Sequence, residues 1–144
     1  MPVNLGTKKV TLNIDEDLAL SDESLDGDMC ALPQLIGAYA ELMGEAHAYA
    51  ANLKYAMDME EARADQRVRI AAKAADEKIT EPAIKQRVTL DLKVGAARRA
   101  YYAADGQHRT LEGLLRALRD KANLSIAICY KLKEEIRVTN SPLG

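Results

Sequence analysis

Apolar residues recur at alternating steps of four and three along two long stretches of the chain, the heptad pattern of helices that pack in pairs. The first stretch comprises Leu32, Ile36, Tyr39, Met43, Ala46, Ala50, Leu53 and Met57. The same phase continues through Glu60, Ala64, Arg67, Ala71 and Ala74, where the side chains become small and charge enters. The pattern predicts a helix over residues 29–79, with Asp28 as its cap and Pro33 in its first turn.

The second stretch is longer and more regular. It comprises Leu90, Val94, Ala97, Tyr101, Ala104, His108, Leu111, Leu115, Leu118, Ala122, Ser125, Cys129, Leu132 and Ile136. Asp105-Gly106 would ordinarily indicate a turn. Because the apolar positions pass through that pair in register, the pattern favours one continuous helix over residues 82–138.

Thr80-Glu81-Pro82 separates the two stretches and reads as the start of a helix. A Thr hydroxyl can cap exposed N–H groups, an acid favours the positive end of the helix dipole, and proline is tolerated in the first turn. We therefore expect a hinge at residues 80–82 between two arms of similar length, within a helical domain over residues 29–138.

Two such arms predict an all-α fold, either a long antiparallel helical hairpin or a small helical bundle with coiled-coil-like seams. Further apolar residues fall outside the seams, namely Tyr49, Val68, Ile70, Ile84, Val88, Leu114, Leu124 and Ile128. They widen the apolar face beyond what one partner helix covers, which favours association with other subunits.

The first 28 residues differ from the rest in charge. They hold two basic and seven acidic side chains, whereas the remainder holds 18 basic and 15 acidic ones. Residues 8–14 alternate apolar and polar and predict a short strand whose partner the pattern does not reveal. Residues 15–28 offer little to bury and are interpreted as loop or disorder, so we expect a mostly unstructured acidic leader over residues 1–28. Residues 139–144 form a C-terminal tail.

Composition narrows the function classes. The chain has 144 residues, no Phe or Trp, and 29% charged residues, which suits thin helix-on-helix seams. Cys30 and Cys129 lie far apart and favour reduced thiols in a cytoplasmic protein. No apolar run approaches the roughly 20 residues of a membrane-spanning helix, and no lipidation motif occurs.

Catalytic signatures are missing from the sequence. His47 and His108 have no metal-ligand spacing, and no phosphate-binding loop, serine elbow or Glu-x-x-His motif occurs. We expect no enzymatic activity, no metal and no cofactor.

Basic residues gather on both sides of the hinge. Arg63, Arg67, Arg69, Lys73 and Lys78 precede or enter it, and Lys85, Arg87 and Lys93 follow it. Such a cluster can neutralise nucleic-acid phosphates. Arg98, Arg99 and Arg109 stand beside Tyr101 and Tyr102, a mixture typical of single-strand binders. The alternative is that acids such as Asp65, Glu77 and Asp91 pair with these bases on solvated helix faces.

The order of features resembles the UvsY family of phage recombination mediators. The resemblance covers most of residues 25–137: an acidic leader precedes Leu32-Pro33-Gln34-Leu35-Ile36, a helix rich in Ala, Lys and Arg follows, and a second helix opens at Thr80-Glu81-Pro82. It implies an oligomer, ring-shaped in the family, that binds single-stranded DNA. It also implies partnership with a recombinase and a single-strand-binding protein in the host cytoplasm.

The resemblance assigns the family's basic segment to Arg67, Arg69, Lys73 and Lys78, and we add Lys85 as a phosphate contact. Arg63, Arg87 and Lys93 are secondary candidates. Leu111, Leu115, Leu118, Leu132 and Ile136 are expected to hold the protomer and the oligomer together. The aromatic and glycine-rich element beside the family's basic segment is replaced by Ala74-Ala75-Asp76-Glu77.

Two other functions remain open. The chain could be a coiled-coil structural or protein-interaction module, such as a phage adaptor or assembly factor. It could also inhibit a host nucleic-acid enzyme, with the acidic leader as a DNA mimic.

Overall fold

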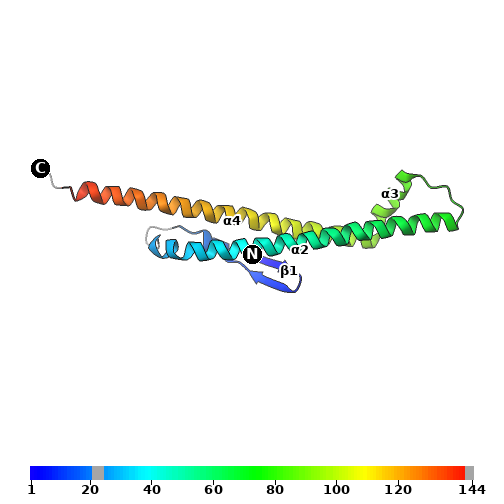
Figure 1. Cartoon of the computed structure of the whole chain (residues 1–144), viewed down its shortest axis with the longest axis horizontal. Coiled ribbons are helices and arrows are strands. Elements are labelled where there is room, and N and C mark those ends of the chain that lie inside the picture. The colour runs from blue at the N-terminus through cyan, green and yellow to red at the C-terminus, as the bar shows by residue number, and fades with distance from the viewer. Residues whose placement is uncertain (21–24, 142–144) are drawn as a thin grey trace. The chain divides into compact units, whose positions relative to one another are not determined.

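The chain is mostly helical, with long helix-on-helix packing, as the seams predicted. The computed structural model describes residues 1–20 and 25–141. Within them lie two strands, β1 (Pro2–Leu5) and β2 (Lys8–Thr11), and four helices, α1 (Ile14–Leu18), α2 (Leu25–Ala74), α3 (Glu81–Leu90) and α4 (Leu92–Thr139) (Figure 1). The chain divides into two compact units. Unit 1 comprises residues 1–3, 10–43 and 110–144, and unit 2 comprises residues 4–9 and 44–109.

In unit 1, the first part of α2 packs on the second half of α4. Leu32 and Tyr39 are buried against Leu115 and Leu118. Met29, near the start of α2, contacts Cys129, which lies farther along α4 than Leu115 and Leu118. The two helices therefore run antiparallel here. All four buried residues belong to the predicted seams, and the apolar periodicity therefore predicted this interface.

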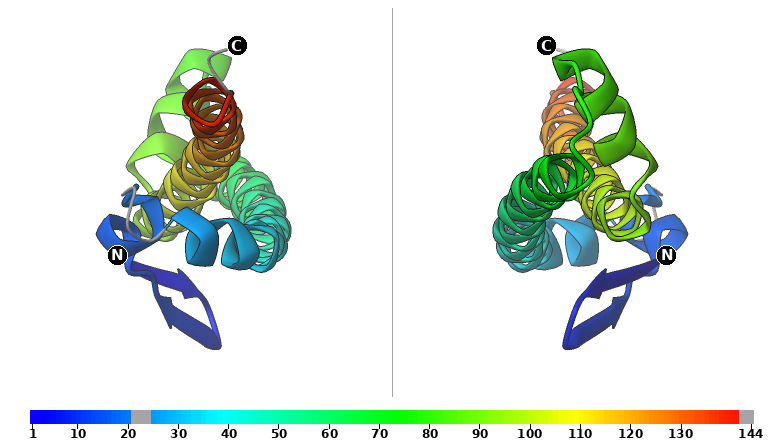
Figure 2. Two further views of the ribbon diagram at one scale, coloured as in Figure 1. Left: turned by 90° about the vertical axis from the view of Figure 1, so that its left-hand side faces the viewer. Right: turned by 90° about the vertical axis from the view of Figure 1, so that its right-hand side faces the viewer.

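In unit 2, α3 packs with α2 and α4 around a second core (Figure 2). Ala64, Ile84, Val88 and Val94 are buried together, with Val68 and Ile79 packed against them. Ile84, Val88 and Val68 lie outside the seams, and we expected other subunits to cover them. That expectation is wrong for these three side chains, because this core covers them within the chain.

The second helical stretch is interrupted at Asp91 and not at Asp105-Gly106. The helix passes through Asp105-Gly106 without interruption and stops instead at Asp91, between α3 and α4. Asp91 has an extended backbone, with ψ of 127°, and its Oδ1 accepts the N–H groups of Lys93 (2.9 Å) and Val94 (3.2 Å). It therefore caps the start of α4. Leu90, expected on the seam, is 72% exposed because α3 leaves the line of α4 at this point.

The hinge also differs from the expected one. α2 ends at Ala74, and residues 75–80 connect it to α3, with Asp76 in the left-handed region at φ 51°. α3 begins at Glu81 with Pro82 in its first turn, as the sequence predicted. Thr80 precedes the helix, but its hydroxyl makes no capping hydrogen bond.

The prediction that residues 1–28 are mostly unstructured is wrong for most of this segment. Residues 2–11 form a two-stranded hairpin, so the strand predicted over 8–14 has Pro2–Leu5 as its partner and ends at Thr11. Gly6 turns the hairpin at φ +79°, and a Cβ there would lie 3.2 Å from the Tyr49 ring. α1 occupies residues 14–18, and residues 21–24 of the expected loop lie outside the described residues.

α2 begins earlier than expected, at Leu25, which places Asp28 inside the helix and Pro33 beyond its first turn. The prediction that Pro33 marks the first turn is therefore wrong. Proline in a helix interior lacks the N–H that would reach back one turn.

Polar contacts hold α1 against the unit 1 helices. The Tyr39 hydroxyl donates a 2.6 Å hydrogen bond to Asp17 Oδ2, and Lys121 Nζ donates to the Asp17 carbonyl at 3.0 Å. Burial, with the hydrogen bond to Asp17 and its negative charge, raises the pKa of Tyr39. Leu12 and Leu18 pack on the same core. Residues 12–18 are thus anchored within unit 1 by both apolar and polar contacts.

Candidate nucleic-acid interface

The arginines expected to contact DNA are tied to acids. In unit 2, Arg67 Nη2 lies 3.1 Å from Glu60 Oε1 and 3.0 Å from Asp91 Oδ2. Arg69 bonds Asp65 on its own helix and Glu81 at the start of α3. These pairs connect α2 to both ends of α3.

Two further arginines of the predicted set are also paired. Arg87 on α3 makes two hydrogen bonds to Glu77 in the connecting segment, at 2.7 and 3.3 Å. Arg63 lies 3.7 Å from Glu60 at its nearest approach. The acids between the bases therefore act as pairing partners, which was the alternative interpretation of the pattern.

Pairing with arginine lowers the pKa of Asp91 and of Glu81. The hydrogen bond from Arg67, followed by that from the Val94 N–H, lowers the pKa of Asp91. The hydrogen bonds from Arg69 lower the pKa of Glu81 in the same way. Both carboxylates are stabilised in their charged form, so the network persists throughout the neutral range.

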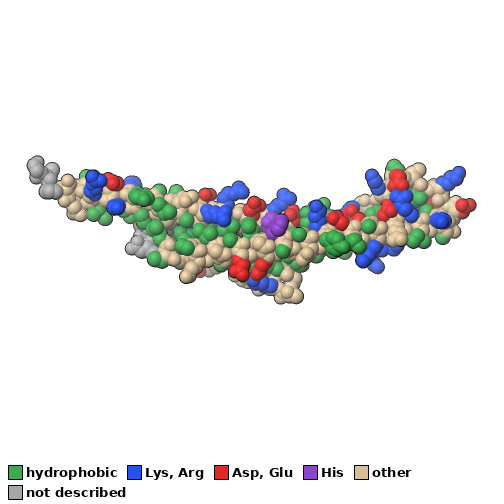
Figure 3. Space-filling model, in the orientation of Figure 1, with side chains coloured by type: hydrophobic (Ala, Val, Ile, Leu, Met, Phe, Trp, Pro, Cys, Tyr) green, Lys and Arg blue, Asp and Glu red, His purple; other side chains and the backbone are tan. Residues whose placement is uncertain are grey.

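The four lysines of the predicted set are different. Lys73, Lys78, Lys85 and Lys93 are all exposed, and none forms an ion pair with another described residue. Figure 3 shows basic side chains gathered around α3 and the adjoining end of α2, with acidic ones among them. Lys85 does act on Glu81 through its charge, which contributes to the lowered pKa of that carboxyl. An exposed ammonium group outside an ion pair can exchange water for phosphate.

The lysines do not share a single surface feature. Lys73 and Lys78 line a shallow groove of about 500 Å³, hereafter the Lys73 groove, together with Arg69, Asp76 and Glu77. Arg69 and Glu77 are held by Glu81 and Arg87, so the charges of this groove that lack an ion pair among the described residues are two ammonium groups and Asp76.

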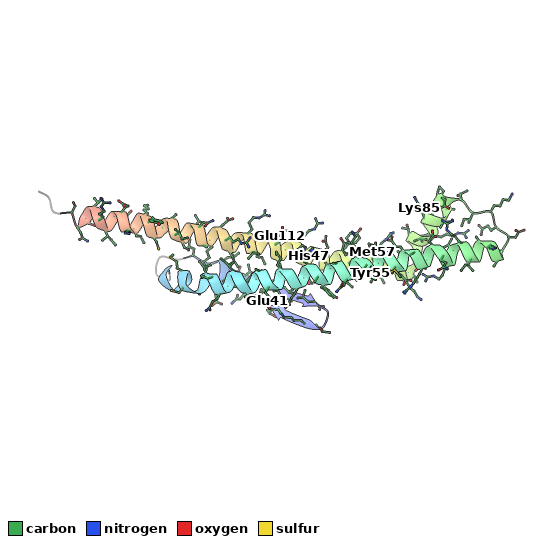
Figure 4. All side chains as sticks on the ribbon, viewed as in Figure 1. Glu41, His47, Tyr55, Met57, Lys85 and Glu112 are labelled. Carbon is green, nitrogen blue, oxygen red and sulfur yellow. The ribbon has the colours of Figure 1, made fainter. Side chains whose placement is uncertain are left out.

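Lys85 lines a second groove, of about 520 Å³ and hereafter the Lys85 groove, with Arg98 and Asp58. Figure 4 labels Lys85 on α3. Lys93 at the start of α4 lines neither groove. The predicted set thus separates into a paired arginine scaffold and lysines distributed over two grooves and one helix start.

The arginines and tyrosines that stand close together on α4 also differ in whether they are accessible. Arg98 Nη2 lies 2.7 Å from Glu61, and Arg109 Nε lies 2.9 Å from Asp105. Tyr101 is half-buried on the seam, while Tyr102 is 63% exposed. Arg99 is exposed without an ion pair among the described residues, so Arg99 and Tyr102 are the accessible members.

The five residues expected to hold the protomer and the oligomer together fall into a buried group and an exposed group along α4. Leu111, Leu115 and Leu118 are buried in the chain itself. Leu132 and Ile136 continue the same seam but are 41% and 60% exposed, and every residue from Tyr130 to Asn140 is exposed. Their part of the seam is free to pack on another molecule.

No family model, curated protein or solved structure matches the chain. Within residues 1–20 and 25–141, no helix combines the length and apolar character needed to cross a bilayer. The same residues contain no group of three or more His, Cys, Asp or Glu side chains placed to hold a metal.

The sequence does not reveal which acid pairs with which base in this site. The sequence indicates that Asp91 and Glu81 can pair with nearby bases, but it does not predict the capping role of Asp91 or the long-range partners Arg67 and Arg69. The available signal was that acids lie on both sides of the segment that connects α2 to α3. An arginine on α2 can reach an acid beyond this segment once the chain turns back. The periodicity of the seam concealed the break, since Leu90 and Val94 keep its register.

Proposed function

We propose that the chain is an oligomeric protein that binds single-stranded DNA and acts as a recombination mediator, helping a phage recombinase to load onto DNA. The observation that carries the proposal is the set of exposed lysines in unit 2, Lys73, Lys78, Lys85 and Lys93, which lack ion pairs among the described residues. The resemblance to the UvsY family supports it independently.

In this proposal the arginines and lysines have separate roles. Arg67, Arg69 and Arg87 hold α2, the connecting segment and α3 together through their acids. The lysines bind the phosphates, and their affinity depends on salt because phosphate binding releases counterions. One protomer offers few contacts, so several protomers on one strand supply the affinity through multivalency.

The deciding experiment is a fluorescence-anisotropy titration of a labelled single-stranded oligonucleotide at several salt concentrations. We expect Lys73→Gln/Lys78→Gln to weaken binding. The slope of log affinity against log salt should fall by about 0.7 for each phosphate that the variant no longer neutralises. Adding Lys85→Gln and Lys93→Gln should lower it further.

Lys9→Gln/Lys54→Gln is the matched control. These lysines are also exposed, lack ion pairs in the described chain and lie in unit 2, so both double variants remove the same charge. An equal reduction in affinity for both would show that only net charge matters and would overturn the site. No binding by the parent chain at low salt would overturn the function.

A second candidate is a coiled-coil interaction module, supported by the exposed end of the α4 seam at Leu132 and Ile136. In that case the charges serve solubility and partner choice. The same titration separates the two candidates, since the interaction module predicts self-association without salt-dependent DNA binding.

A further inference from the structure

Two imidazoles meet across the helices of unit 2. The rings of His47 on α2 and His108 on α4 have centroids 4.9 Å apart and planes tilted by 56°. They are the only histidines in the chain. Figure 4 labels His47 on the side of α2 next to α4.

Among the described residues, no hydrogen bond or ion pair reaches either imidazole. His47 is exposed and His108 half-buried, so solvent and small ions can reach the pair from the His47 side. Ring nitrogens without hydrogen-bond partners remain available as ligands.

Two carboxylates on the helices that carry the histidines, Glu45 and Asp105, are paired with bases. Glu45 on α2 binds Lys8 of the hairpin at 2.7 Å, and Asp105 on α4 binds Arg109 at 2.9 Å. Gln107, next to His108, accepts the Asn4 N–H.

The spacing fits a shared metal ion. With zinc–nitrogen bonds of about 2.0–2.1 Å and tetrahedral angles, two coordinating imidazoles have ring centroids roughly 5 Å apart. The observed centroid separation of 4.9 Å is close to this value.

We propose that His47 and His108 form an interhelical site for a divalent first-row transition-metal ion, with Zn²⁺, Ni²⁺ and Cu²⁺ as the cations that imidazole prefers. The two rings supply two ligands, and water completes the coordination. Bound metal ties α2 to α4 and stabilises unit 2. Metal binding uses the unprotonated ring nitrogens.

The test is thermal unfolding of the full-length chain, followed by circular dichroism, with ZnCl₂ and with MgCl₂ as the control cation. We expect Zn²⁺ but not Mg²⁺ to raise the unfolding temperature in proportion to the logarithm of its concentration above the dissociation constant. His47→Gln, at an exposed position, should lower Zn²⁺ affinity at least about tenfold, and His108→Gln should do the same.

The thiols need a control because Cys30 and Cys129 can also bind zinc. Cys30→Ser/Cys129→Ser should keep the zinc-dependent rise. Electron paramagnetic resonance of bound Cu²⁺ should show two nitrogen ligands in this thiol-free chain and fewer in its His47→Gln derivative. The absence of a zinc effect, or an equal effect in the His47→Gln chain, would overturn the proposal. The outcome of this experiment does not depend on whether the chain binds DNA.

Discussion

The Arg69 guanidinium on α2 holds the Glu81 carboxylate, at the first residue of α3, through two parallel hydrogen bonds of 2.9 and 2.8 Å. Nε of the same guanidinium bonds Asp65 one turn earlier on α2 at 2.7 Å. The second interaction orients the first, because a guanidinium anchored on its own helix presents its other edge in a fixed direction. This geometry positions the start of α3 without a cap from the Thr80 hydroxyl.

The first prediction concerns acid stability. The folded-state pKa of Glu81 is lowered mainly by hydrogen bonds from Arg69, and that of Asp91 mainly by the hydrogen bond from Arg67. A lowered folded pKa contributes stability above the ordinary carboxyl pKa of about 4, and this stability disappears as the pH falls through the folded value. The effect of these pairs should be constant between about pH 7 and 5 and should be lost progressively as the pH falls below about 4.

Urea unfolding of the parent chain and of Arg69→Met/Glu81→Met, at a series of pH values, measures this dependence. The stability difference between the two proteins should shrink as the pH falls below about 4, since the variant has no pair to lose. Added salt should reduce the difference at neutral pH because the pair is exposed. A difference that does not change with pH would mean that the pair makes no electrostatic contribution.

The second prediction separates the two roles of Asp91, which caps α4 through Oδ1 and binds Arg67 through Oδ2. Asp91→Asn keeps a capping oxygen but removes the negative charge, whereas Asp91→Ala removes both. We expect Asp91→Asn to lower the unfolding temperature slightly and Asp91→Ala to lower it more. The larger decrease should come with faster amide exchange at Lys93 and Val94. Equal exchange rates in the two variants would contradict the capping role.

The third prediction distinguishes core from surface positions on one seam. Leu118 is fully buried, whereas Leu132 and Ile136 are exposed farther along the same helix. Leu118→Ala should destabilise the protomer by about 2–5 kcal/mol, because it leaves a cavity. Leu132→Ser/Ile136→Ser should leave the helical circular dichroism unchanged and reduce self-association in sedimentation velocity. Leu124→Ser, exposed but outside the seam, is the control, and self-association that survives the double variant would exclude this part of α4 as the interface.

The apolar periodicity predicted both long helices because a heptad seam reports directly which side chains are buried. It predicted Leu32, Tyr39, Leu115 and Leu118 as core for that reason. The break at Asp91 does not disturb the register, since Leu90 and Val94 are four residues apart on either side of it. Periodicity alone therefore cannot detect it, and only the capping chemistry of Asp91 indicates it.

The candidate site was less predictable for an electrostatic reason. A count of charges along the sequence does not tell which acid reaches which base once the chain turns back. Arg67 and Asp91 are 24 positions apart, and Arg69 and Glu81 are 12 apart. The lysines and arginines of the predicted set look alike in sequence, and only the fold separates the paired arginines from the unpaired lysines.

The last prediction concerns the anchoring of the leader. Tyr39 is almost fully buried, and its hydroxyl donates a 2.6 Å hydrogen bond to Asp17, a short polar link between α1 and α2. Tyr39→Phe keeps the ring in the core and removes only this bond, which should cost about 1 kcal/mol. Hydrogen exchange should accelerate in residues 14–18 and change little at Leu115 and Leu118. Asp17→Asn keeps an acceptor but removes the charge, so it should have a smaller effect. Uniform acceleration throughout unit 1 would instead mean that the bond supports the core as a whole.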